Sequence, residues 1–215
     1  MSDTLYLSLW YPNLRLAGLA EKLTAVLSAF AAHGGEARVY SSTVWPVNRS
    51  ETPVFQQVYG RLVQAAGSES SPQGPLGALP QEAVAETLEQ LHEDFAYEFQ
   101  IGWKLWEMEA AGGLDVRWRR QPRLVRVIGY GPLFDDGCYE ADGHIRIDLG
   151  SDAPFLEEDA ELDAIGAGHV AENVVQLVAL AGAVEKASGA TARLLWSELG
   201  ESLAERLAAR LGVRN

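Results

Sequence analysis

Histidine and carboxylate residues occur at spacings that could support acid–base or metal chemistry. His92, Glu93 and Asp94 are consecutive, and adjacent side chains point apart, which matches no metal motif. Four polar residues recur at i, i+3, i+4 and i+7 and would share one stripe of a helix: His169, Glu172, Asn173 and Gln176. An H-x-x-E pair can hold a metal if a third ligand arrives from elsewhere, but the zinc pattern H-E-x-x-H is absent. We therefore expect polar helix residues and no metal site.

Nucleophile and cofactor motifs give no clearer signal. The single cysteine, Cys138, lies among Asp135, Asp136 and Glu140, whose charges would raise the pKa of the thiol and weaken it as a nucleophile. A lone cysteine also excludes an internal disulfide and a multi-cysteine zinc site. The segment Gly166-x-Gly168-x-x-Ala171 lacks the preceding strand of a dinucleotide-binding turn, and no phosphate-binding loop or hydrolase elbow occurs. The sequence implies no cofactor.

Composition limits the classes of function. The chain has 215 residues, 47% of them hydrophobic and 22% charged, which fits one soluble domain. The net charge of −13 argues against nucleic-acid binding and permits a basic partner or a cationic ligand. The N-terminus lacks the pattern of a signal peptide, and the segment nearest to a membrane span, residues 174–184, is interrupted by Gln176 and too short. We expect a cytoplasmic protein without membrane contact.

A strand–helix–strand unit occurs at each end of the chain and must position any site. The first covers residues 5–10, 15–33 and 36–44; the second covers residues 144–150, 163–188 and 191–196. Gly34-x-x-Ala37-Arg38 is echoed by Gly189-x-x-Ala192-Arg193. Such crossovers join parallel strands. The expected fold is α+β: a mixed β-sheet with helices on one face, ferredoxin-like, in which residues 1–66 and 123–215 are halves of a duplicated βαβ unit.

The middle of the chain connects these units. Its pattern predicts helices at residues 54–66 and 81–92, separated by a Ser-, Pro- and Gly-rich mobile loop at residues 67–80. Strong alternation predicts a central strand at residues 95–103, and residues 123–129 form another strand. Two Asp-Gly pairs predict tight turns of a meander. We expect a closing helix at residues 198–211, and we expect Val178 on the buried side of the helix at residues 163–188.

The strands carry polar and aromatic side chains on the face opposite their core residues. The expected open face contains Tyr6, Ser8, Trp10, Arg38, Tyr40, Glu98, Gln100, Arg126, His144, Arg146, Asp148 and Arg193. Nine of them form the candidate binding site: Tyr6, Trp10, Arg38, Tyr40, Arg126, His144, Arg146, Asp148 and Arg193. Aromatic rings and arginines suit a small anionic ligand, a peptide or a partner protein. The alternatives are a solvated face of internal salt bridges and a homodimer formed through this face.

Three functions remain open at this point. The leading hypothesis is a non-enzymatic binding protein that uses this face. The second is a hydrolase whose acid–base groups come from His144, Asp148, His92 or His169. The third is an acidic interaction protein, such as a toxin-neutralising partner of a basic protein. All depend on strand register, because a slip of one residue exchanges the two faces.

Four short segments of the sequence resemble those of a known family. They are Ser8-Leu9-Trp10-Tyr11-Pro12, His92-Glu93-Asp94-Phe95-Ala96-Tyr97, Gly143-His144-Ile145-Arg146-Ile147-Asp148-Leu149-Gly150 and Leu195-Trp196-Ser197-Glu198. Together they resemble an uncharacterised family of bacterial proteins of unknown function, over nearly the whole chain. The resemblance implies no activity, cofactor or catalytic residue, and it supports a self-contained protein.

Overall fold

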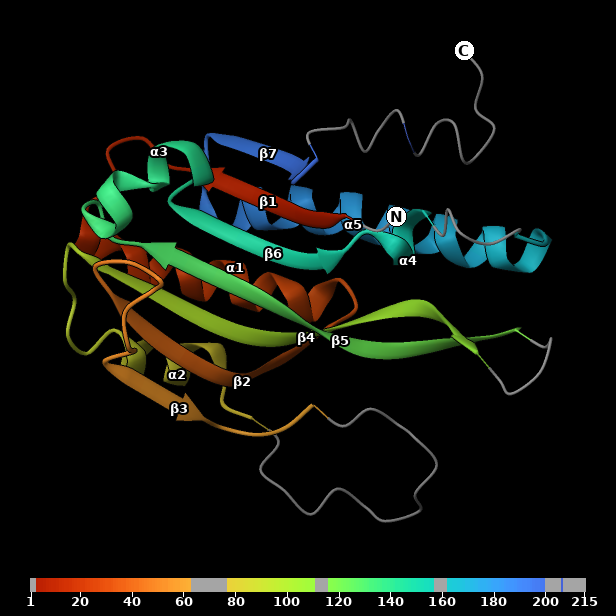
Figure 1. The fold of residues 1–215 in the computed structure, drawn as a ribbon, viewed down its shortest axis with the longest axis horizontal. Coiled ribbons are helices and arrows are strands. Elements are labelled where there is room, and N and C mark those ends of the chain that lie inside the picture. Colours follow the sequence, from red (N-terminus) through yellow and green to blue (C-terminus); the bar gives the residue numbers. More distant parts are fainter. Residues whose placement is uncertain (1–2, 63–76, 111–115, 157–161, 200–205, 207–215) are drawn as a thin grey trace.

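The computed structural model describes residues 3–62, 77–110, 116–156, 162–199 and 206 of the chain, and these form an α+β fold around one seven-stranded sheet (Figure 1). In chain order the strands are β1 (Thr4–Trp10), β2 (Gly35–Pro46), β3 (Phe55–Val58), β4 (Phe95–Ala110), β5 (Val116–Tyr130), β6 (Ile145–Ser151) and β7 (Ala192–Ser197). Their order in the sheet is β3-β2-β4-β5-β6-β1-β7.

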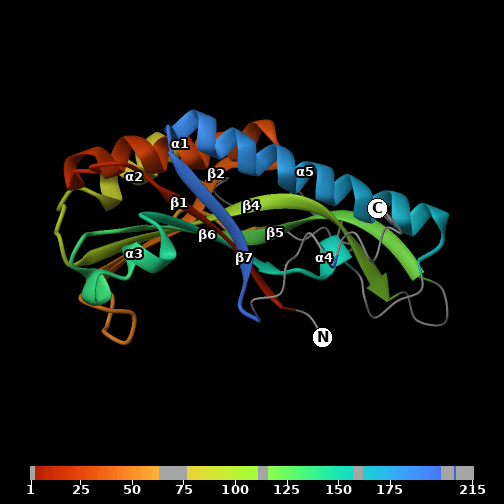
Figure 2. The ribbon, with the colours of Figure 1, turned by 90° about the horizontal axis from the view of Figure 1, so that it is seen from above.

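The helices differ greatly in length and position. They are α1 (Leu19–Ala32), α2 (Pro80–Thr87), α3 (Tyr139–Asp142), α4 (Ala153–Leu156) and α5 (Ala164–Ser188), with short 3-10 turns η1 (Leu16–Gly18) and η2 (Phe134–Gly137). Figure 2 shows α1, α2 and α5 together on one face of the sheet and α3 on the opposite side. The three longer helices thus confirm the expected one-sided covering.

Alternation along the strands decides which residues form the core. Leu5, Leu7 and Leu9 of β1 are fully buried and pack in one cluster with residues of α1 and α5. Full burial of a leucine side chain stabilises the fold by about 1.5–3 kcal/mol. The other strands contribute alternate residues to the same cluster, such as Phe99 and Ile101 of β4. The helix-covered face is therefore the apolar face, and the other face carries the intervening residues.

The expected mixed sheet is wrong, because every strand pairing among the described residues is antiparallel. Each antiparallel pairing reverses the strand direction. Following the pairings across the sheet shows that β1 and β2 run in the same direction, and so do β6 and β7, as the strand–helix–strand pattern predicts. However, β6, β5 and β4 lie between β1 and β2, and β1 lies between β6 and β7. The strands joined by a crossover are therefore not hydrogen-bonded neighbours.

Local predictions in the middle of the chain need correction. Residues 55–58 form the edge strand β3 and not a helix, because their backbone pairs with Ser41–Val44 of β2. The predicted helix at residues 81–92 ends at Thr87. The two Asp-Gly pairs lie at the ends of η2 and α3, which connect β5 to β6, and do not form two-residue hairpin turns. Residues 67–76 of the expected loop, and residues 200–205 and 207–211 of the closing helix, lie outside the described residues.

Helix α5 has well-defined ends and an unexpected exposure. The Asp163 side chain accepts a hydrogen bond from the Gly166 N–H at 2.7 Å, and Gly189 ends the helix in the left-handed conformation at φ +71°. Val178 is 63% exposed, so its predicted burial is wrong.

Of the helices in the described residues, α5 alone is long and apolar enough to cross a membrane, and one-third of its most apolar window is buried. Helices that cover a sheet also meet this criterion.

Candidate binding site on the open sheet face

The open face brings together residues from β1, β5 and β6. In the register of these strands Tyr6 lies opposite Asp148, Ser8 lies opposite Arg146, and Arg126 also lies opposite Asp148. All five therefore share the face that α1 and α5 leave uncovered, since their neighbours Leu7 and Ile147 belong to the helix-side core. The strand register places these five side chains on the predicted side of the sheet, where Tyr6, Ser8 and Asp148 are buried and not open to solvent.

Arg146 lies between two tyrosine rings. Its guanidinium carbon is 5.3 Å from the centroid of Tyr6 and 5.7 Å from that of Tyr130. It also forms an ion pair with Asp142 of α3, and 14% of its side chain is exposed. Cation–π contacts and a partly buried ion pair stabilise this arrangement internally. Arg146 is therefore a structural centre of the face, with little of its charge available to a ligand.

The aromatic surface continues into β7 through a residue that the sequence prediction missed. Trp196 stacks on Tyr6 with ring centroids 4.6 Å apart, and its indole N–H donates to Ser8 Oγ at 2.9 Å. The Tyr6 hydroxyl donates to Glu198 at 3.0 Å. Trp10 donates its indole N–H to the carbonyl of Glu140 at 3.3 Å. Alternation within β7 could have suggested Trp196 only if the pairing of β7 with β1 were known.

Arg126 and Asp148 form a second internal pair. Arg126 donates to Asp148, whose other carboxylate oxygen accepts the Gly150 N–H at 2.9 Å. The side chain of Asp148 is 5% exposed, whereas that of Arg126 is 45% exposed. Burial alone would lower the pKa of Arg126. The charge and the hydrogen bond of Asp148 outweigh burial, so the pKa is raised above its ordinary value. The alternative of internal salt bridges on this face is thus observed for Arg126 with Asp148 and for Arg146 with Asp142.

Three of the predicted site residues lie elsewhere. Arg193 is on the helix side and forms an ion pair with Glu185 of α5 at 2.7 Å, because it pairs in register with Leu9. Its assignment to the open face is wrong. Arg38 and Tyr40 belong to β2, which β4, β5 and β6 separate from β1. Tyr40 is buried, with its ring above Gly102 on the open face.

A cavity opens beside α3, where β1 and β5 end and β6 begins. It has a volume of about 250 Å³ and is lined by Tyr11, Asn13, Leu14, Leu16, Leu19, Tyr130, Pro132, Tyr139 and His144. Three tyrosines and one histidine supply four of its nine lining residues. We call it the tyrosine–histidine cavity. His144 is the predicted site residue that reaches it, and none of these lining residues is a carboxylate.

The hydrogen bonding of His144 defines its chemistry. The backbone N–H of Tyr11 donates to Nδ1 of His144 at 3.2 Å. A neutral imidazole that accepts at Nδ1 carries its proton on Nε2, so the ring offers one N–H donor. Burial lowers the pKa of His144 below 6.5 and favours this neutral form at pH 7. Burial also raises the pKa of Tyr11 and of Tyr130 to about 12, so both phenols stay protonated.

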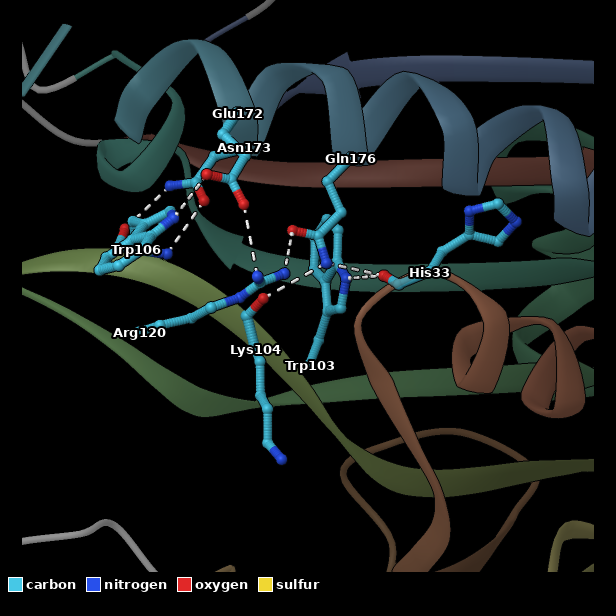
Figure 3. A network of polar contacts seen from close by, with 8 residues as sticks. All are labelled: His33, Trp103, Lys104, Trp106, Arg120, Glu172, Asn173 and Gln176. Carbon is cyan, nitrogen blue, oxygen red and sulfur yellow. Dashed lines mark hydrogen bonds and ion pairs between the residues drawn. The ribbon is translucent and has the colours of Figure 1, made fainter. Parts of the chain in front are cut away.

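The polar stripe on α5 has a structural role, which Figure 3 shows. Asn173 is fully buried; its side chain accepts the Trp106 N–H at 2.9 Å and donates to the Trp106 carbonyl at 2.8 Å. Glu172 accepts the indole N–H of Trp106 at 2.9 Å, and Gln176 donates to the His33 carbonyl at 2.8 Å. The amides satisfy the edge of β4 beyond the end of β2. His169 stacks on Trp106 at 3.9 Å.

The groups proposed for a hydrolase do not assemble into one site. His144, just before β6, and Asp148 within β6 are four residues apart, about 13 Å for an extended chain, and each has a different partner. His92 is exposed beside Asp94 at 3.2 Å, and His169 lies on α5. No group of three potential metal ligands occurs among the described residues. Burial, then Asp142 and Asp135, raise the pKa of the Cys138 thiol to about 11, which agrees with the predicted low reactivity.

Comparison of the chain with protein-family models, with curated proteins and with solved structures finds no match.

Proposed function

We propose that the protein is a non-enzymatic binding protein whose ligand site is the tyrosine–histidine cavity at the edge of the open sheet face. The observation that supports this most directly is the fixed orientation of His144, which the Tyr11 N–H holds at Nδ1. A donor held in place within an aromatic cavity suits a ligand that combines one ring with an acceptor oxygen. A carbonyl or carboxylate group on an aromatic or aliphatic ring meets both requirements.

The size and polarity of the cavity narrow the ligand class. A volume of about 250 Å³ is below the range of drug-sized sites, so it accommodates a single-ring molecule. Leu14, Leu16 and Leu19 supply apolar surface for the ring. Arg146 and Arg126 already pair with Asp142 and Asp148, so a free arginine is not the expected anchor for an anion. His144 is the expected anchor.

Charge on the ligand should therefore act through His144. An anionic ligand favours the protonated imidazole, which gains an ion pair but loses the hydrogen bond from the Tyr11 N–H at Nδ1, whereas a neutral ligand uses only the Nε2–H donor. Affinity for an anionic ring should rise as the pH falls toward the pKa of His144. Affinity for a neutral ring of the same size should not rise. This difference separates a charge effect from simple filling of the cavity.

Benzoate and benzamide are suitable probes because each combines one ring with an acceptor oxygen. Ligand-observed NMR should show binding of both, with Kd of about 1 mM, as expected for nine-atom ligands. His144→Asn should reduce binding at least about tenfold, because the shorter amide keeps an acceptor for the Tyr11 N–H but loses the Nε2–H. No binding at about 10 mM would contradict the proposal.

The matched control is His92→Asn. His92 is exposed, contacts Asp94 and Phe95, and does not line the cavity. This variant should bind both probes as the unchanged protein does. Equal losses in both variants, or no loss in either, would mean that the probes bind elsewhere. Thermal denaturation of each variant verifies that the fold is retained.

The fold itself supports a more specific relationship. We infer that the protein is a ferredoxin-like fold with a duplicated βαβ unit and an inserted hairpin. Removal of β3, β4 and β5 leaves the order β2-β6-β1-β7, with α1 and α5 on one face. That is the strand arrangement of a ferredoxin-like βαββαβ unit. The echo of Gly34-x-x-Ala37-Arg38 in Gly189-x-x-Ala192-Arg193 supports duplication.

A further inference from the structure

The outer side of α5 carries exposed apolar side chains, and of its two charged residues Glu172 contacts Trp106 of β4 and Arg120 of β5. It consists of one helical stripe, which we call the α5 stripe: Ala164, Gly168, Ala171, Glu172, Val175, Val178, Ala179, Gly182 and Lys186. Val175 is 69% exposed, Val178 is 63% exposed and the flanking Ile165 is 67% exposed. A β-carbon added at Gly168 would meet nothing within 4 Å. Exposed apolar surface of this kind is typical of an interaction site.

The two charged residues of the stripe are placed symmetrically. Glu172 and Lys186 each lie seven residues from Ala179, on either side of it. Seven residues are almost two helical turns, so all three lie on the same side of the helix. Among the described residues Lys186 has no ion-pair partner, whereas Glu172 contacts Arg120 at 3.3 Å while half exposed. The stripe is therefore complementary in charge to an antiparallel copy of itself.

We propose that two copies of the chain pair through antiparallel α5 helices, with Ala179 beside the two-fold axis. In this arrangement Glu172 of each copy faces Lys186 of the other, and both contacts form together because the interface is isologous. Val175 of one copy then lies beside Gly182 of the other, where the missing side chain leaves room. Small residues along the stripe allow the two helices to approach closely.

Cysteine cross-linking tests the register directly. Ala179→Cys places a thiol close to its symmetry mate, so mild oxidation should give a disulfide-linked dimer. The matched control on the same stripe is Gly168→Cys. In an antiparallel pair its two copies are separated by 22 residues along the helices, about 33 Å, and should not cross-link. The unchanged chain should not cross-link either, since its single cysteine, Cys138, is partly buried away from α5.

Sedimentation tests the contact energy independently. The unchanged protein should sediment at twice its 23.4 kDa chain mass, and Val175→Arg should raise the dissociation constant at least about thirtyfold. Val54→Arg is the control, because Val54 is 57% exposed on the β2–β3 connection, outside α5. That variant should remain dimeric.

Several results would overturn the proposal. A monomer at concentrations up to about 0.1 mM would do so. A dimer that Val175→Arg leaves intact, or that cross-links equally through Gly168→Cys, would assign the contact to another surface or to parallel helices. Flotation of the unchanged protein with vesicles of phosphatidylcholine and phosphatidylglycerol, lost in Val175→Arg, would identify a lipid surface as the occupant.

Discussion

Asn173 offers the sharpest test of how α5 holds the long β4–β5 hairpin. Its side-chain amide accepts the Trp106 N–H at 2.9 Å and donates to the carbonyls of Trp106 and Pro154, each at 2.8 Å. β2 pairs with β4 only as far as Trp103. Beyond that point the Asn173 side chain bonds the backbone N–H and C=O of Trp106, as a neighbouring strand would. Replacement by alanine should leave these three backbone groups without their partner.

The expected loss follows from those three hydrogen bonds. At about 1 kcal/mol each, Asn173→Ala should lower the free energy of unfolding by about 3 kcal/mol. For a domain of this size that corresponds to a fall in Tm of about 6–12 °C. Asn173→Asp should lower stability at least as much at pH 7, because it keeps the acceptor for Trp106 but directs a buried carboxylate at two carbonyl oxygens.

Urea denaturation measures the loss, and hydrogen exchange locates it. Exchange of the Trp106 amide should accelerate in Asn173→Ala more than that of amides in β1. Part of the loss in Asn173→Asp should disappear as the pH falls, since a protonated carboxyl group can donate to one carbonyl. Gln176→Ala is the matched control; it removes three hydrogen bonds of the same stripe, none of them fully buried, and should be milder. A loss below about 1 kcal/mol for Asn173→Ala, with unchanged Trp106 exchange, would refute the edge-capping role.

Two further predictions concern the open face and the cavity. Arg146→Ala should lower the free energy of unfolding by about 2–3 kcal/mol, because it removes two cation–π contacts and the partner of Asp142; Trp10→Ala should change it by less, and thermal denaturation that shows equal effects would contradict this difference. Between pH 6.5 and the lowered pKa of His144 the unfolded chain binds more protons, so stability should fall as the pH drops through that window; His144→Asn should flatten this part of the curve in pH-dependent urea denaturation, and an unchanged slope would exclude His144 as its source.

The elements that depend on local pattern were predictable. Alternation in β1 and β6 and the long apolar helix α5 appear in the sequence at nearly their observed bounds, because side-chain periodicity is a property of neighbouring residues. The long-range pairings were not. Residues 55–58 have the spacing of a short helix but form β3, because the free edge of β2 offers them backbone partners. Such a partner is invisible in a local window.

Some features of the candidate site were likewise predictable from local sequence, and others depended on long-range pairing. Alternation alone separated Tyr6 and Trp10 from the leucines of β1. It could not assign Arg193, because the face of β7 depends on pairing with β1, more than 180 residues earlier in the chain. The aromatic partners of Arg146 also required the fold, which brings Tyr6 of β1 and Tyr130 of β5 to it.

The sequence by itself determined the strands other than β3, the two main helices, the α+β class and which side of β1 is apolar, since all of these follow from periodicity over a few residues. Only the tertiary structure decided the strand order, the antiparallel pairing, the cavity around His144 and the exposure of Val175 and Val178. The physical reason is that burial and hydrogen bonding depend on which distant segments meet. An apolar helix side and a polar strand face acquire their roles only when the neighbouring elements cover them or leave them open.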